Sequence, residues 1–248
     1  LSLDGGVRKV GGVLSMVMEA KREGFKEIYI PLENIAEGKL VKDIEVYPVT
    51  SLKQLVLHLN EVQKIKPLPK ENILRNLDRA YDVDFSDVKG QPLARRALEI
   101  AAAGGHSILM MGSPGCGKTM LARRLVTILP PVTEAEALEI TKIYSIVNML
   151  PNTESVMVER PFRSPHHSVS ASALLGGGTY PRPGEVTLSH NGVLFLDELP
   201  EFERAALEML RQPLEDGEVN ISRVRGSMNF PSKFLLVAAQ NPCPCGYY

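Results

Sequence analysis

Tryptophan is absent from this 248-residue sequence, and cysteine occurs only three times. So few cysteines exclude a small domain built on disulfides and favour a protein of the reducing cytoplasm. No apolar run approaches the roughly 20 residues that a membrane-spanning helix requires, so we expect no membrane partner. The first residues, Leu1 to Gly5, have neither the basic start nor the apolar stretch of a signal peptide. Because they also lack an initiator methionine, we expect a fragment that begins inside a domain.

The sequence also lacks an excess of charge of either sign, since its formal net charge is −1. Apolar residues make up 44% and charged residues 23% of the chain, which are ordinary values for a globular protein. A nucleic-acid site therefore has to be a local basic patch, because the bulk composition does not favour such a partner.

Three regions of different character follow one another along the chain. Residues 1–60 alternate short strands and helices, whereas residues 61–84 are an extended, basic link that contains prolines. From residue 85 to residue 248 the pattern is α/β, with apolar strands followed by amphipathic helices. We expect buried strands at 106–111, 193–196 and 234–240, and helices at 93–103, 118–129 and 202–211. The fold class is therefore α/β, with a parallel sheet flanked by helices and preceded by part of a smaller α/β domain.

A glycine-rich loop joins the first of these strands to its helix. It fits the pattern G-x-x-x-x-G-K-[ST] with Gly112, Ser113, Pro114, Gly115, Cys116, Gly117, Lys118 and Thr119. Glycines allow the backbone N–H groups to wrap a phosphate, and the helix N-terminus favours an anion. Lys118 can then reach the β- and γ-phosphates of ATP, and the Thr119 hydroxyl can ligate Mg²⁺. A simple glycine-rich turn would explain the glycines but not the Lys-Thr pair at the helix start.

Two acids, Asp197 and Glu198, directly follow the buried strand 193–196. At the carboxyl edge of a parallel sheet, Asp197 can hold Mg²⁺ and Glu198 can polarise the attacking water as a general base. The alternative is that the two acids only begin a helix, whose N-terminus favours negative charge.

Asn241 follows the strand 234–240 and can orient the same water, although Asn before Pro242 is also a common turn former. The order of phosphate loop, acid pair and polar strand tip is that of AAA+ ATPases. The site is therefore predicted to bind and hydrolyse ATP, with Lys118, Glu198 and Asn241 as its catalytic residues.

Five further segments are specific enough to suggest a family. They read FSDVKGQ at 85–91, RPFRSPHH at 160–167, RPGEV at 182–186, GVLFLDELPEF at 192–202 and NPCPCG at 241–246. Together they resemble the ComM/YifB family of bacterial magnesium-chelatase-like AAA+ ATPases, over nearly the whole chain. The resemblance implies that Gly90 and Gln91 border the adenine and that the protein is a homo-hexamer. It also implies that a neighbouring subunit completes the site with an arginine.

The same resemblance implies a domain organisation and an activity. Residues 1–60 are similar to the C-terminal part of a Lon-protease-like domain, residues 61–84 are the linker, and residues 85–248 are a truncated AAA+ core. In Lon a lysine follows a Gly-Gly pair, whereas Gly11-Gly12 is followed here by Val13 and Leu14, which disfavours proteolysis. The implied activity is a motor that remodels single-stranded or branched DNA. The main alternative is a magnesium-chelatase motor subunit that acts on a protein partner in tetrapyrrole metallation.

Two insertions of this AAA+ branch are expected, at about 162–189 and as a hairpin at about 217–233. Arg223, Arg225 and Lys233 make the hairpin basic, which suits contact with DNA phosphates, although exposed charges on a solvated hairpin are an equal alternative.

Histidine and cysteine pairs raise the question of a metal. His166 and His167 are adjacent, so on a strand they would point to opposite faces, and a packing or loop role is favoured over a metal site. Cys243 and Cys245 form half of a possible zinc site, which is weak support for zinc.

Overall fold

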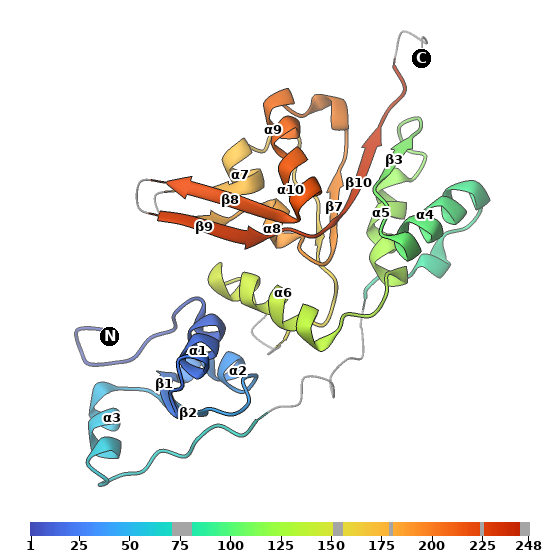
Figure 1. The fold of residues 1–248 in the computed structure, drawn as a ribbon. Helices are drawn as coiled ribbons and strands as arrows, with labels where there is room; N and C mark the ends of the chain where they lie inside the picture. Colours follow the sequence, from blue (N-terminus) through green and yellow to red (C-terminus); the bar gives the residue numbers. More distant parts are fainter. Residues whose placement is uncertain (71–80, 151–155, 179–180, 224–225, 244–248) are drawn as a thin grey trace. The chain divides into compact units, whose positions relative to one another are not determined.

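The structure is a computed structural model of residues 1–248 and describes all of them except 71–80, 151–155, 179–180, 224–225 and 244–248 (Figure 1). The chain divides into two compact units. The first comprises Leu1–Asp78 and Glu134–Val158, and the second comprises Arg79–Thr133 and Glu159–Tyr248. The chain therefore leaves the second unit after residue 133, contributes residues 134–158 to the first unit, and re-enters the second unit at residue 159. This division concerns compactness alone, so the domain boundaries expected from the sequence stay a prediction.

The first unit is built around two parallel strands, β1 (Glu27–Pro31) and β2 (Glu45–Val49). The helices of this unit are α1 (Val13–Arg22), α2 (Ile35–Gly38), α3 (Leu52–Leu59) and α6 (Glu134–Ile146). Ser51 caps the N-terminus of helix α3, because its hydroxyl accepts a hydrogen bond from the Gln54 N–H at 3.2 Å. The core gathers apolar residues from α1, both strands, the turn before β2 and the segment after α3, namely Val13, Leu14, Val17, Ile30, Leu40, Val41, Ile44, Val46 and Leu68.

Helix α6 is tied to α1 through a buried carboxylate. Glu37, which is 5% exposed, accepts hydrogen bonds from the Leu14 N–H at 2.9 Å and from Asn34 Nδ2 at 2.7 Å. The Ser145 hydroxyl of α6 donates to Oε2 of the same carboxylate, the oxygen that also accepts from the Leu14 N–H. Because the Leu14 N–H belongs to the first turn of α1, Glu37 satisfies a donor that the helix itself leaves open. A segment distant in sequence thus becomes part of the first unit.

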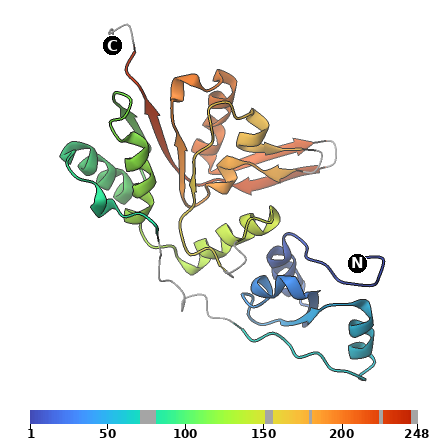
Figure 2. The ribbon, with the colours of Figure 1, turned by 180° about the vertical axis from the view of Figure 1, so that it is seen from behind.

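The second unit contains a parallel four-stranded sheet, with helices on either side of it (Figure 1, Figure 2). The strand order is β3 (Ile108–Met111), β10 (Leu235–Gln240), β7 (Val193–Leu196) and β4 (Phe162–Arg163). Helices α4 (Pro92–Gly104) and α5 (Lys118–Leu125) lie beside β3. All four residues of β7 are fully buried, as expected for a central strand. The predicted α/β class with a parallel sheet is confirmed.

A second layer covers the β7 side of the sheet. It contains α7 (Ala171–Leu175), α8 (Glu185–Leu188), α9 (Arg204–Met209) and α10 (Arg211–Asp216), with the short pair β5 (Gly176–Gly177) and β6 (Arg182–Pro183). The hairpin expected near 217–233 is confirmed as β8 (Glu218–Arg223) and β9 (Gly226–Pro231), which pair antiparallel. Its inward residues Val219, Ile221 and Phe230 join a core with Leu194 and Leu196.

Two local expectations are wrong. Strand β3 was expected to be buried on both faces, but it lies at the edge of the described sheet, and Leu109 and Met111 are 52% and 53% exposed. One helix was expected at 202–211, but two helices occupy this region, and the second, α10, continues past residue 211 and contains Pro213. Proline is tolerated there because it falls in the first turn, where no intrahelical N–H bond is lost.

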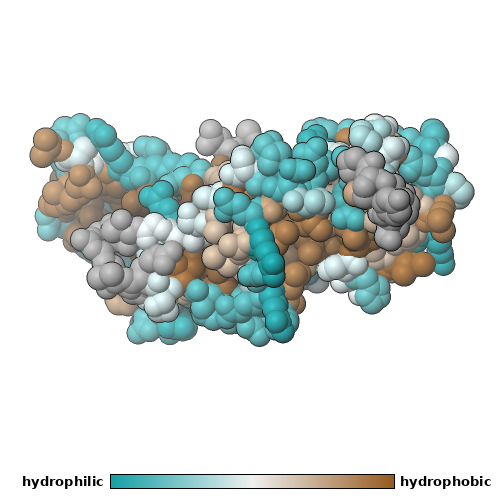
Figure 3. Space-filling model, turned by 90° about the horizontal axis from the view of Figure 1, so that it is seen from above, coloured by the Kyte–Doolittle hydropathy of each residue, from teal (hydrophilic) through white to brown (hydrophobic). Residues whose placement is uncertain are grey.

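Apolar residues also remain on the face that Figure 3 shows, between hydrophilic ones. Among the described residues, no helix is both long and apolar enough to cross a membrane.

Candidate functional site

The glycine-rich loop lies between the end of β3 and the start of α5, as its sequence predicts. Gly115 and Gly117 have φ angles of 77° and 92°, a region that residues with a side chain rarely adopt. A Cβ on Gly115 would meet nothing within 4 Å, so open space lies beside this turn. A Cβ on Gly112 would lie only 2.8 Å from Cys116 Sγ. The loop is therefore a cradle of backbone groups that a phosphate can enter.

Lys118, the first residue of α5, turns its ammonium back over this loop. Its Nζ donates to the carbonyl oxygens of Gly112 at 2.7 Å and Ser113 at 3.2 Å. It also donates to Asn241 Oδ1 at 3.0 Å, which joins the loop to the tip of β10. The structure thus brings together two of the three residues for which the sequence predicts a catalytic role.

Thr119 and Asp197 meet directly, because the Thr119 hydroxyl donates to Asp197 Oδ2 at 2.7 Å. Hydroxyl and carboxylate oxygens are the hard ligands that Mg²⁺ prefers. Neighbouring ligands of an octahedral Mg²⁺ lie about 2.9 Å apart, since bonds of about 2.0–2.1 Å meet at right angles. The observed oxygen separation is close to this value, so both residues fit one magnesium ion.

Glu198 follows in a left-handed backbone conformation, with φ of 54° and ψ of 47°. Its carboxylate Oε2 lies 3.3 Å from His167 Nδ1, and its side chain is 51% exposed. The His167 ring in turn contacts the His166 ring at a centroid distance of 4.0 Å and the Phe202 ring edge-on at 6.5 Å. Both histidines lie in a loop after β4, as favoured from the sequence. The contact of His167 with Glu198 was missed, because no local pattern reports it.

Strand order explains why these residues converge. Strand β10 lies between β3 and β7, so its tip residue Asn241 falls between the phosphate loop and the acid pair. Polar residues at the carboxyl ends of neighbouring parallel strands face the same crevice. A cavity of about 370 Å³ occupies this edge, and its lining residues are Pro114, Gly115, Gly117, Lys118, Thr119, Met120, Asp197, Glu198 and Asn241.

Gly90 and Gln91 lie just before α4, and Gln91 contacts the phosphate loop. Both have positive φ angles, 72° and 49°, which form the turn that leads into the helix. Gln91 Nε2 donates to the Cys116 carbonyl oxygen at 2.8 Å. This bond shows that the segment supports the loop, while its contact with adenine stays a prediction.

The remaining predicted residues belong to the segment of β8 and β9 and to the residues after β10 along the chain. Arg223 ends β8 opposite Gly226, and Arg225 lies outside the described residues. Cys245 also lies outside them, and Cys243 is disulfide-bonded, so its sulfur is not a free thiolate for zinc. Within the described part of the chain, no group of three or more histidine, cysteine or acidic side chains could hold a metal ion.

Comparisons with known proteins show the family to which the chain belongs. Residues 84–248 match the family described as magnesium chelatase, subunit ChlI. The chain is 47% identical over 251 residues to Competence protein ComM of Haemophilus influenzae, covering 100% of the chain and 49% of that protein. It is 45% identical over 252 residues to the uncharacterized protein YifB of Escherichia coli, covering 100% of the chain and 48% of that protein. The chain therefore spans about half the length of these curated relatives.

More distant relatives belong to magnesium chelatase. The chain is 26% identical over 176 residues to the magnesium-chelatase 38 kDa subunit of Rhodobacter capsulatus, covering 64% of the chain and 50% of that protein. A solved structure of the complex between subunits BchI and BchD of magnesium chelatase matches with a TM-score of 0.51 and 26% identity. The match covers 65% of this chain and 56% of the matched chain. With these matches and the phosphate-loop geometry, the chain belongs to the magnesium-chelatase-like AAA+ family, next to the ComM and YifB proteins.

Proposed function

We propose that this chain binds ATP together with Mg²⁺ and hydrolyses it. The observation that supports the proposal best is the meeting of Lys118, Thr119, Asp197 and Asn241 at one edge of the sheet, around an open cradle of backbone groups. Such a cradle with hard oxygen ligands beside it suits a nucleoside triphosphate and its metal.

Each residue has a distinct task in this proposal. The backbone N–H groups of residues 112–119 hold the phosphates, and the Lys118 ammonium exchanges its carbonyl partners for phosphate oxygens. Thr119 and Asp197 would hold the magnesium ion, which when bound neutralises charge on the phosphates. Gly90 and Gln91 support the loop and border the adenine.

Glu198 is the proposed general base. Its carboxylate lines the same cavity as Lys118 and accepts the proton of the attacking water. Asn241 orients that water from the tip of β10, with the amide oxygen that contacts Lys118 in this structure. The two residues approach from neighbouring strand ends, so one water can contact both.

We further propose that ATP hydrolysis drives the remodelling of single-stranded or branched DNA by a homo-hexamer. The identity to a competence protein along the whole chain and the hairpin of β8 and β9 support this proposal. Residues 1–60 would be the end of a Lon-protease-like domain without a peptidase lysine, because Val13 and Leu14 begin α1 after the Gly-Gly pair. The protein would then work in the bacterial cytoplasm as an ATPase motor and not as a protease.

The alternative is a magnesium-chelatase-type motor subunit that acts on a protein partner. Its support is the likeness to the 38 kDa chelatase subunit and to the BchI and BchD complex. The lower identity and shorter coverage of these relatives favour the DNA motor.

One experiment separates these functions, namely the ATPase rate of the full-length protein with and without branched DNA. We expect hydrolysis to rise with DNA. An ATPase rate that does not change with DNA but rises with a chelatase partner protein supports the alternative. Peptide cleavage supports a protease. Absence of any ATP hydrolysis, with intact fold and magnesium present, contradicts the ATPase itself.

A further inference from the structure

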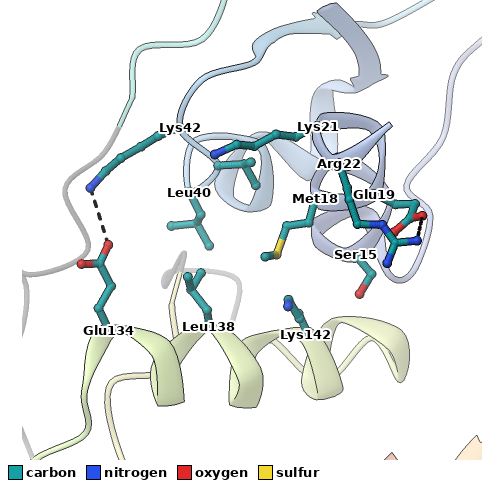
Figure 4. A pocket seen from close by; sticks show the side chains of 11 residues that line it. Ser15, Met18, Glu19, Lys21, Arg22, Leu40, Lys42, Glu134, Leu138 and Lys142 are labelled. Atoms are coloured by element: carbon teal, nitrogen blue, oxygen red, sulfur yellow. Dashed lines mark hydrogen bonds and ion pairs between the residues drawn. The ribbon is translucent and has the colours of Figure 1, made fainter. Parts of the chain in front are cut away.

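A cavity of about 720 Å³ lies within the first unit, apart from the phosphate loop. Its walls come from α1, from residues 40–42 and from α6 (Figure 4). Small-molecule sites usually measure roughly 300–1,000 Å³ and combine an apolar lining with a few polar groups. The volume therefore suits an organic ligand of moderate size.

The interior of the cavity is aliphatic. Met18 of α1, Leu40 and Leu138 of α6 face one another across it (Figure 4). No aromatic side chain lines it among the described residues, so it lacks the stacking surface on which proteins hold nucleic-acid bases. An aliphatic body fits this lining better than a nucleobase does.

Three of the four cations around the cavity already have acidic partners. Arg22 pairs with Glu19 at 2.5 Å, and Lys42 pairs with Glu134 at 3.5 Å. Lys21 pairs at 3.0 Å with Asp43, which does not line the cavity. These pairs neutralise the two acids of the lining, so the acids do not repel an incoming anion.

Lys142 of α6 differs from the other three cations. Its side chain is half-buried, and within the described part of the chain it has no ion pair or hydrogen bond. Figure 4 shows its amine directed from α6 toward Ser15 and Met18 of α1. A partly desolvated ammonium without a partner gains free energy when an anion joins it.

We propose that this cavity binds an amphipathic organic anion with an aliphatic body and a carboxylate or phosphate head. The head group accepts hydrogen bonds from the Lys142 ammonium and the Ser15 hydroxyl. The body lies on Met18, Leu40 and Leu138. This site shares no residue with the ATP site and does not depend on the proposed ATPase.

The test is calorimetric titration of the 248-residue chain with decanoate, decyl phosphate, decanol and acetate. We expect saturable binding of one decanoate or decyl phosphate per chain, and the tighter of the two identifies the preferred head. Decanol lacks the charge and should bind at least about tenfold more weakly, the scale of one hydrogen bond to a charged group. Acetate lacks the body and should also bind at least about tenfold more weakly, because it buries almost no apolar surface.

Lys142→Met keeps the aliphatic stem and removes the charge, and it should weaken decanoate binding about tenfold without changing decanol binding. Lys53→Met on α3 is the matched control, because Lys53 is exposed and outside the cavity. Circular dichroism of both variants checks that they are folded. The proposal is overturned if decanoate does not bind, if decanol binds equally well, or if the folded Lys142→Met variant binds decanoate like the parent.

Discussion

His167 Nδ1 lies 3.3 Å from Glu198 Oε2 and thereby holds the carboxylate of the proposed general base from a neighbouring loop. The His167 ring is itself fixed by the rings of His166 and Phe202. We expect His167→Ala to lower kcat for ATP about tenfold, because a misplaced base loses near-attack geometry. The affinity for ATP should not change, since His167 does not line the cradle.

His106→Ala provides the matched control for this variant, because His106 is exposed and does not line the cavity at the phosphate loop. His167→Gln keeps an N–H donor and should recover part of the rate. If His167→Ala has the same kcat as the parent and as His106→Ala, His167 has no positioning role, while the ATPase assignment is unaffected.

Lys118→Ala should weaken ATP binding by roughly tenfold or more, the scale of a lost hydrogen bond to a charged group. The Lys118 ammonium contacts both the loop and Asn241. Isothermal titration with a slowly hydrolysed ATP analogue measures the effect. Lys89→Ala is the control, because Lys89 is exposed and contacts only the Ser86 carbonyl. An unchanged affinity of Lys118→Ala for the ATP analogue would contradict the phosphate-loop assignment.

Glu198→Gln keeps the shape of the side chain and removes the base. We expect retained ATP binding and a hydrolysis rate reduced roughly 10²-fold or more, the scale of general-base catalysis. Glu201→Gln, three residues further on in the exposed turn, should hydrolyse ATP normally. Normal turnover in Glu198→Gln assigns the base to another residue.

The local parts of this site could be predicted from the sequence because their signals are short-range. Strand β7 has the predicted bounds, and Lys118 and Thr119 begin a helix after a strand, as the loop pattern requires. The meeting of Thr119 with Asp197 followed from one general rule, that parallel strands end at a common edge.

The features that the sequence did not predict depend on tertiary context. Helix α6 buries Thr141, Tyr144 and Ser145 together with apolar residues, so no clean apolar stripe marks it. Its acidic first turn, with Glu134 and Glu136, is the signal that could have found it. Strand β3 has an apolar run typical of a buried strand, although it lies at the edge of the described sheet. The sequence pattern of a strand does not indicate whether another strand pairs with it, so this edge position could not be predicted.

Tyr47 in the first unit predicts a dependence on alkaline pH. Its hydroxyl donates to Glu45 Oε2 at 2.6 Å, and this hydrogen bond, followed by burial and nearby charges, raises the pKa of Tyr47 to about 12. The unfolded chain releases this proton near the ordinary pKa of 10.0, so between pH 10 and pH 12 the folded state binds more protons. Stability should therefore fall as pH rises through this range.

Urea unfolding of the parent and of Tyr47→Phe at pH 9 and pH 11 measures this effect. Phenylalanine cannot ionise, so the loss of stability between the two pH values should be smaller in the variant. Tyr29 stacks on Tyr47 at a centroid distance of 5.3 Å, and its pKa is also raised, chiefly by burial and then by Glu27. Tyr29→Phe in the same assay therefore measures how much of the loss of stability between the two pH values comes from Tyr29. Equal losses in the parent and in Tyr47→Phe contradict the prediction.

The basic hairpin of β8 and β9 gives the last prediction. Arg223 is the final residue of β8 and pairs with Gly226 in β9, next to the hairpin tip. Arg225 lies outside the described residues, and its place in a DNA contact stays a prediction from the sequence. If both cations neutralise phosphates, replacing them with alanine should weaken DNA binding and reduce its salt slope by about 0.9 per lost contact on a duplex.

The matched control is the double variant Arg204→Ala and Arg211→Ala. It removes the same charge from α9 and α10, where each arginine pairs only with a glutamate four residues on. ATP affinity should be unchanged in both double variants, because Arg204 and Arg211 do not line the cavity at the phosphate loop and the hairpin arginines are distant from that loop in the sequence. If the hairpin variant keeps the parent's affinity and salt slope, its arginines are solvated surface charges. The DNA contact would then have to lie elsewhere, with the insertion between Arg163 and Arg182 as the next segment to mutate.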